Sequence, residues 1–327
     1  MRAYFIRITK ADSDPLQASN VLAQYTSFNP NGSTNGAALQ VEFDIPAFAY
    51  GDPAGNAYLK ISGVNYADIV AANNLNDADI TVYGGMAKGL PLANPAQAGV
   101  LFKGSVFQCF GNWQGNQTSL ELICYAKKGT VASPVNLAYL WKKGSSLQDA
   151  VTQTLKIAYP GSVITGGYDA ALVYPEDQPF AYQTLNQFAK FVLDTSRTII
   201  PAAAYIGAQI VQKPGGFFLF DGTQPPAGKA ISFLDLIGQP TWIDAGTMQF
   251  RAVLRADLNV GDVVTMPKGS NVINTANSFT RYRDTTAFQG SFTVKSIRHL
   301  GNSRQTSAES WITVVDTYSN KPAPAVA

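Results

Sequence analysis

Apolar and polar residues alternate along the first third of the chain. Leu39, Val41, Phe43 and Ile45 alternate with polar residues, so an extended segment here would have one apolar face. Glycine, proline and asparagine cluster between this run and similar ones, as turn formers do. Repeated short strands separated by turns predict an antiparallel barrel or sandwich. The similar runs lie at 4–8, 59–61, 80–83, 101–110 and 120–122.

The hydrophobic period changes in the middle of the chain. Ser145 and Ser146 offer hydroxyl groups that can cap free backbone amides, with a polar partner three residues later. Apolar residues then follow at helical spacing from Leu147 to Ala158, and Tyr159-Pro160-Gly161 ends the run. A second helix is predicted to begin near Pro179, because proline is tolerated in a first turn. Its apolar face would comprise Ala181, Leu185, Phe188, Ala189 and Val192.

Strand patterns return after residue 203. Residues 248–254 alternate, and Asn259-Val260-Gly261-Asp262 predicts a turn into the next strand at 263–266. Further strands are expected at 216–222, 292–295 and 311–315. The predicted fold is mainly β with a small α element (α+β), in which two β units surround a small helical element. The expected boundaries are 1–140 for the first β unit, 141–200 for the helical unit, 201–319 for the second β unit and 320–327 for a flexible tail.

Composition narrows the choice of partners. The 327 residues are 46% hydrophobic and only 14% charged, whereas about a quarter is usual. A surface with few charges suits contact with other subunits, although a solvated monomer rich in uncharged polar residues is equally consistent with this composition. A net charge of +2 provides no strong field for nucleic acid or an anionic membrane.

Targeting and cysteine usage are also informative. The start of the chain lacks the apolar run of a signal peptide, so we expect folding in a cytoplasm. The apolar stretch 198–211 is interrupted by Pro201 and Gly207 and is too short to cross a bilayer. Cys109 and Cys124 are too few for a disulfide scaffold or a four-ligand metal site, and we interpret them as buried thiols.

Candidate chemistry is weak throughout. The single histidine, His299, cannot form a histidine metal cluster, and a hydrogen-bonded strand-end role is favoured over catalysis. Two carboxylate pairs, Asp77 with Asp79 and Glu176 with Asp177, are better explained as turn and cap residues than as acid-base or calcium sites. The segment 280–283 interleaves arginine with tyrosine but is interpreted as an exposed loop. We predict no catalytic residue, cofactor or metal.

Several motifs together resemble a known family. The Gly238-Gln239-Pro240 corner, the strand after it and the Gly261-Asp262 turn resemble the C-terminal half of tail hub proteins from bacteriophages with contractile tails and Gram-negative hosts. Gly290 opens a segment that is similar to the family's strand leading to a His-x-Gly-Asp turn, here His299 to Asn302, and Trp311 lies in the final strand. Asn302 replaces the acid of that turn. Ala256-Asp257 stands where a proline is common.

The resemblance extends to earlier segments and implies an architecture. Residues 79–85, 101–107 and 120–124 are similar to the family's first barrel. The family implies two tube-like antiparallel β-barrel domains joined by a small helical domain. Three subunits would form a pseudo-sixfold ring between a sixfold tail tube and a threefold spike. In such a ring Gly238, Pro240, Gly261 and Gly290 would set the backbone geometry of corners.

The expected partners follow from that resemblance. They are two further copies in a homotrimer, the tail tube protein, the central spike protein and other baseplate components, with a tape measure protein as a further candidate. No membrane is expected, DNA would be met only as it passes through the channel, and the protein would belong to the virion after assembly in the host cytoplasm. Two alternatives stay open: a carbohydrate-binding, adhesin-like tail-tip protein with Trp113 or Tyr168 in a stacking platform, and a wall-degrading enzyme, although we expect no appended lysozyme-like domain after Ser319.

Overall fold

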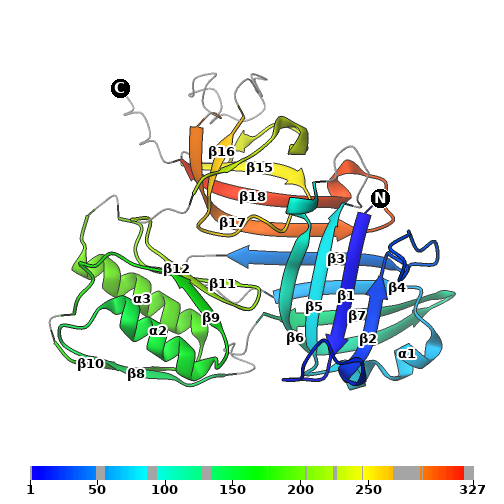
Figure 1. Cartoon of the computed structure of the whole chain (residues 1–327), viewed down its shortest axis with the longest axis horizontal. Coiled ribbons are helices and arrows are strands. Elements are labelled where there is room, and N and C mark those ends of the chain that lie inside the picture. The colour runs from blue at the N-terminus through cyan, green and yellow to red at the C-terminus, as the bar shows by residue number, and fades with distance from the viewer. Residues whose placement is uncertain are drawn as a thin grey trace.

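The chain folds into two β units and a helical unit that lie beside one another (Figure 1). The computed structural model describes residues 2–48, 56–86, 94–126, 134–174, 176–202, 205–223, 227–244, 246–267, 288 and 290–319. Taken together, these ranges contain more strand than helix, so the prediction of a mainly β fold is confirmed.

The first β unit contains the strands predicted from alternation. Val41, Phe43 and Ile45 are buried on one face of their strand, and Leu59 and Ile61 are buried on the next. These side chains belong to one hydrophobic core that also holds the thiols of Cys109 and Cys124, which are free and buried as predicted. The elements are β1 (Arg2–Thr9), β2 (Val21–Thr26), β3 (Gln40–Phe48), β4 (Asn56–Ser62), α1 (Tyr66–Val70), β5 (Asp79–Met86), β6 (Gly99–Gln114) and β7 (Gln117–Tyr125).

The helical unit confirms the first predicted helix and its cap. The Ser146 hydroxyl accepts a hydrogen bond from the Asp149 N–H at 3.1 Å and donates one to the Asp149 carboxylate at 2.8 Å. The first of these bonds satisfies an amide that the first helical turn leaves without a partner. The elements are β8 (Leu137–Trp141), α2 (Leu147–Ala158), β9 (Val163–Gly166), β10 (Gln178–Tyr182), α3 (Leu185–Ile199), β11 (Gln209–Lys213) and β12 (Gly216–Phe220).

The prediction that the second helix begins near Pro179 is wrong. Residues 178–182 form β10, which pairs antiparallel with β8, and the helix begins only at Leu185. The Thr184 hydroxyl accepts from the Gln187 N–H and so caps this helix. Pairing with a strand about 40 residues earlier decided the structure of this segment, and local periodicity does not report such a partner. The predicted apolar residues from Leu185 to Val192 do form the buried face of α3.

The second β unit completes the chain with a core of its own. Met248, Phe250 and Ala252 alternate inward, as the sequence pattern predicts, and pack with Val264 and Trp242. The elements are β13 (Lys229–Ala230), β14 (Thr241–Trp242), β15 (Thr247–Val253), β16 (Val263–Met266), β17 (Gly290–Asn302) and β18 (Trp311–Ser319).

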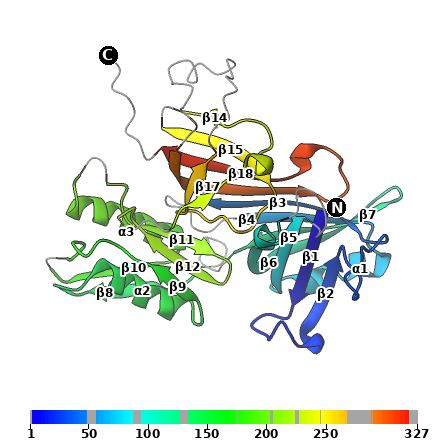
Figure 2. The ribbon, with the colours of Figure 1, turned by 45° about the horizontal axis from the view of Figure 1, so that its top comes forward.

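One sheet runs through both β units and repeats a single strand order. The first unit contributes β3-β4-β7-β6-β5-β1, and the second contributes β14-β15-β18-β17-β16-β13. The repeat differs at its end, where β1 is antiparallel to β5 and also pairs with β2, while β13 is parallel to β16. The two units are joined because β17 also pairs with β3, which makes a 13-stranded sheet. Figure 2 shows β14, β15, β18 and β17 side by side with β3 and β4 in one continuous sheet.

Candidate functional site

The polar residues that connect the two β units gather where β17 meets β3. No cluster of three or more His, Cys, Asp or Glu side chains suited to a metal occurs in the described ranges. No helix within those ranges is long and apolar enough to span a bilayer. The junction between the β units is the candidate functional site.

The junction begins with a backbone ladder. Residues 296–302 of β17 run antiparallel to residues 42–48 of β3, and the ladder continues where the Ser303 N–H donates to the Val41 carbonyl at 2.8 Å. On the outer face, Arg298 Nε donates to Asp44 Oδ1 at 2.7 Å, and its Nη2 donates to the other carboxylate oxygen. A bidentate pair of this kind orients both strands, although its solvent exposure keeps its energy small.

Trp311 connects the two β units on the inner face of the same junction. Its indole N–H donates to the Gly85 carbonyl of the first β unit at 2.9 Å, and its ring packs edge-to-face on Phe43 at 5.1 Å between centroids. Gly301 lies beneath the Phe43 ring. A Cβ atom on this glycine would come 2.2 Å from Phe43 Cζ, so the close approach of the two units requires a residue without a side chain.

His299 lies in the paired part of β17 and is buried. Its Nδ1 is 3.0 Å from the Thr313 hydroxyl, which also bonds both the N–H and the carbonyl of Arg255. Burial lowers the pKa of His299 to about 4, because the charged imidazolium would lose its hydration. The ring is therefore neutral near pH 7 and serves in a hydrogen-bond chain inside the sheet.

Arg255 extends this chain across the interface. It is 3% exposed, and its guanidinium donates to both Asp257 carboxylate oxygens at 2.8 and 2.7 Å. A third bond reaches Asp235 at 3.4 Å, and the same Asp235 oxygen accepts from Gln97 Nε2 of the first β unit at 2.9 Å. The Ala256 N–H donates to the Gln97 carbonyl at 2.7 Å. A buried arginine needs such a full set of partners, because removing one would leave a charge uncompensated.

The remaining predicted motif residues lie at turns of the second β unit. Gly261 has a φ of +86°, and its N–H donates to the Val294 carbonyl at 2.9 Å. The Asp262 carboxylate accepts from Lys229 Nζ at 2.7 Å and from the Asn259 N–H at 2.7 Å. Gly238 and Pro240 lead into β14 and Gly290 opens β17, so the structure brings His299 and Trp311 to the junction but not these three.

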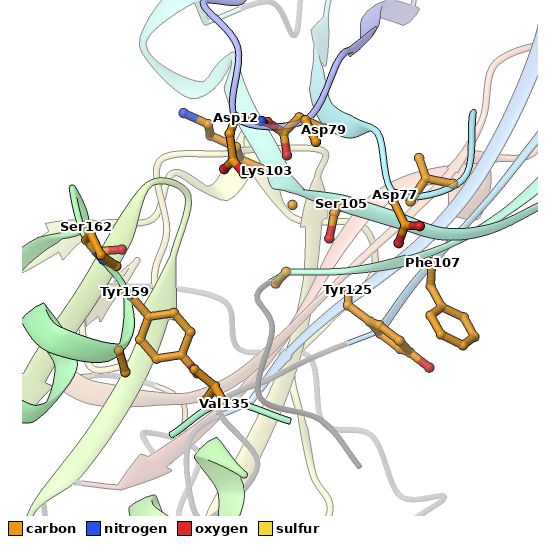
Figure 3. A pocket seen from close by; sticks show the side chains of 16 residues that line it. Asp12, Asp77, Asp79, Lys103, Ser105, Phe107, Tyr125, Val135, Tyr159 and Ser162 are labelled. Atoms are coloured by element: carbon orange, nitrogen blue, oxygen red, sulfur yellow. The ribbon is translucent and has the colours of Figure 1, made fainter. Parts of the chain in front are cut away.

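A cleft of about 480 Å³ lies between the first β unit and the helical unit (Figure 3). Asp79 lies on one wall with Lys103, and Tyr159 and Ser162 lie on the other. The Asp79 carboxylate accepts a hydrogen bond from the Asp12 N–H at 3.0 Å. In the other predicted pair, Asp177 accepts from the Lys143 N–H at 2.7 Å. One carboxylate in each pair thus holds a backbone amide.

Other predicted residues differ in their accessibility. Trp113 is 62% exposed and packs edge-to-face on Tyr66, whereas Tyr168 is only 3% exposed and cannot offer a stacking face. The segment 280–283 and the tail 320–327 lie outside the described residues. Sequence reasoning missed Arg255, because nothing local distinguishes it from an ordinary strand-end arginine. Gly301 belongs to the His-x-Gly-Asp motif of the sequence analysis, but its contact with Phe43 was not predicted.

Comparison with known proteins agrees with this architecture. A tail protein from prophage MuSo2 of Shewanella oneidensis matches with a TM-score of 0.54 at 7% identity, covering 97% of this chain and 98% of that one. A tail protein from Neisseria meningitidis MC58 matches with a TM-score of 0.50 at 10% identity, covering 97% of each chain. The chain shares the fold of these phage tail proteins. The resemblance predicted from the sequence is thereby confirmed at the level of the fold.

A protein from a secretion system has a similar fold. A component of the E. coli type VI secretion system, itself described as structurally similar to the tail proteins gp27 and gp5 of bacteriophage T4, matches with a TM-score of 0.52 at 8% identity. The match covers 88% of this chain and 76% of that one. No family model matches the sequence, and no curated protein does. The likeness to these tail proteins is therefore one of fold and not of sequence.

Proposed function

We propose that this chain is a non-catalytic structural component of a phage tail, the baseplate hub that adapts a sixfold tail tube to a threefold spike. The observation that carries the proposal is the repeated strand order of the two β units. Three copies of a chain with two equivalent units present six equivalent units in a ring. Such a ring matches sixfold symmetry through its β units and threefold symmetry through its chains.

The junction supports this role because a symmetry adaptor needs its two units held at one angle. The shared ladder, Trp311 and the Arg255 network all resist rotation of one unit against the other. The boundaries 1–140, 141–200 and 201–319 would divide a first barrel, a helical connector and a second barrel, with β8, β11 and β12 packed on the connector. Gly238, Pro240, Gly261 and Gly290 would set the corners of the second barrel, and Asp262 would hold the Gly261 turn.

The proposed partners are two further copies, the tail tube protein, the spike protein and other components of the baseplate. Low charge suits a surface largely covered by such partners. The protein would reside in the virion after assembly in the host cytoplasm.

Light scattering coupled to size exclusion tests the proposal first. A mass near three times 35.0 kDa is expected, with rings of six lobes in negative-stain images. A monomer at all concentrations, also after addition of the tube and spike proteins, would contradict it. Binding on a glycan array that disappears in Trp113→Ala would favour the adhesin instead, and a cleared zone in a muralytic zymogram would favour the enzyme.

A further inference from the structure

The cleft between the first β unit and the helical unit has room for a small organic molecule (Figure 3). Its volume is about 480 Å³, and small-molecule sites usually measure roughly 300–1,000 Å³. The loop after β1 and strand β5 lie on one wall, where the Asp79 carboxylate accepts from the Asp12 N–H at 3.0 Å. The end of α2 and the segment that leads into β9 lie on the other wall. Two structural units therefore enclose the space.

The wall on the first β unit is acidic. Its described side chains include three carboxylates and one ammonium group, which leave two negative charges in excess. The carboxylates belong to Asp12, Asp77 and Asp79, and the ammonium group belongs to Lys103. Asp12 and Asp77 are exposed, and the Asp77 N–H donates to the Val106 carbonyl at 2.8 Å, which fixes this turn beside β6. A cation that enters the cleft would therefore meet carboxylates that are already in place.

The opposite wall adds negative potential from a helix end. α2 is 12 residues long, and Ala158 and Tyr159 at its C-terminal end line the cleft. The last carbonyl groups of a helix carry a partial negative charge, which stabilises a cation near the last turn. The Tyr159 N–H donates to the Leu155 carbonyl at 2.8 Å and so keeps this helix end in place. Negative potential thus reaches the cleft from both structural units.

Ser162 on the same wall has a buried hydroxyl group without a partner (Figure 3). Its Oγ atom exposes less than 1 Å² and makes no hydrogen bond within the described part of the chain. A buried polar group without a partner is costly, so this oxygen favours a donor from outside the chain. Rotation about the Cα–Cβ bond can turn the oxygen toward the cleft, where it would accept from an N–H group. A positively charged donor suits both this hydroxyl group and the acidic wall.

Apolar side chains line the remaining part of the cleft. They belong to Val135, Phe107 and Tyr125, and the Phe107 and Tyr125 rings pack at 4.8 Å between centroids. Phe107 is 39% exposed, so its ring is accessible. Methylene groups pack favourably on such rings, and ring faces also attract cations. The cleft therefore combines two negative regions with apolar surface.

We propose that this cleft binds a linear polyamine, a molecule with ammonium groups at both ends of a flexible alkyl chain. One ammonium group would lie against Asp12 and Asp77. The other would lie at the end of α2, where the Ser162 hydroxyl accepts a hydrogen bond from it. The methylene groups would cover Val135 and Tyr125. The site does not depend on the function proposed above, because it uses no residue of the junction between the β units.

Isothermal titration calorimetry of the full chain with spermidine tests the site. Binding is expected, and it should weaken at high salt because the carboxylates are exposed. Asp12→Asn and Asp77→Asn should each weaken binding by about 2- to 5-fold, as the loss of an exposed ion pair does. These residues have φ values of 52° and 62°, which asparagine also tolerates, so both loops should keep their shape. Asp194→Asn, on α3 outside the lining of the cleft, removes the same charge and should leave binding unchanged.

Ser162→Ala separates binding from stability. Without spermidine, the melting temperature of this variant should be unchanged or higher, because the substitution removes a buried oxygen that has no partner. The affinity for spermidine should fall by about tenfold, because a hydrogen bond from a charged donor is lost. A residue with a purely structural role would not change affinity while leaving stability intact.

Three results would overturn the proposal. The first is the absence of binding heat with spermidine. The second is equal weakening by Asp194→Asn and Asp77→Asn, which would indicate a general effect of charge. The third is equal affinity for spermidine and hexylamine, because hexylamine has one ammonium group and can satisfy only one wall.

A blocked lysine-glycine-lysine peptide distinguishes a free polyamine from a basic segment of another protein. Binding of this peptide without binding of spermidine would assign the cleft to such a segment and contradict the polyamine site. A monomeric mass in light scattering would contradict the proposed hub but not this site, so the two failures are distinguishable.

Discussion

The packing of Phe43 on Gly301 allows a direct test of the junction. Gly301→Ala places a methyl group 2.2 Å from Phe43 Cζ, so the ring that contacts Trp311 must move. Overpacking of this kind costs about 1–3 kcal/mol. Replacing glycine also restricts the unfolded chain, which returns about 0.4–1 kcal/mol. We therefore expect Gly301→Ala to lower the free energy of unfolding by roughly 1–2 kcal/mol.

Urea unfolding followed by tryptophan fluorescence measures the change. Gly36→Ala is the matched control, because a Cβ atom there would have nothing within 4 Å and the residue is exposed. Phe43→Leu should make room for the new methyl group. In a double-mutant cycle the two substitutions should therefore couple favourably by about 1 kcal/mol.

Two results would refute the reasoning. One is a urea midpoint for Gly301→Ala equal to that of Gly36→Ala, which would mean that the junction accommodates the methyl group without cost. The other is simple additivity of Gly301→Ala and Phe43→Leu, which would place the loss of stability somewhere other than this contact.

Four further predictions concern other parts of the chain. Gly261→Val should destabilise by at least about 2 kcal/mol, because φ is +86° and the Cβ would lie 3.0 Å from Phe218; an unchanged melting temperature and unchanged assembly would count against a corner role. Ser146→Ala should cost about 1 kcal/mol through loss of the α2 cap, measured by urea unfolding against Gln153→Ala as control. The pKa of His299 is lowered from 6.5 to about 4 in the folded protein, so the unfolded state binds a proton first as the pH falls. The free energy of unfolding should therefore be unaffected by His299 above pH 6.5 and should decrease by about 3 kcal/mol as the pH falls from 6.5 through 4. His299→Gln should remove this part of the pH dependence from urea midpoints measured between pH 7 and pH 4. Burial raises the pKa of Cys109 to about 11 and also raises that of Cys124, so neither thiol should react with a disulfide reagent at pH 8 until urea is added; rapid native reaction would contradict their burial.

Local patterns predicted much of the fold and little of the junction. The alternation at 39–45 and the capping residue Ser146 specify β3 and α2, because each acts through neighbours in sequence. Pro179 misled the helix prediction because the deciding partner, β8, is remote in sequence. Trp311 was recognised only through the family motif, and its hydrogen bond to Gly85 crosses 226 residues.

The sequence by itself determined which residues face a core, where α2 begins and that the two thiols stay buried, because hydrophobic period and capping are local properties. The tertiary structure alone decided that β17 leaves β16 for β3, that Arg255 reaches Gln97 through Asp235, and that both β units share one strand order. These features depend on the register between strands far apart in the chain. That register follows from how whole faces pack, and no short stretch of sequence carries it.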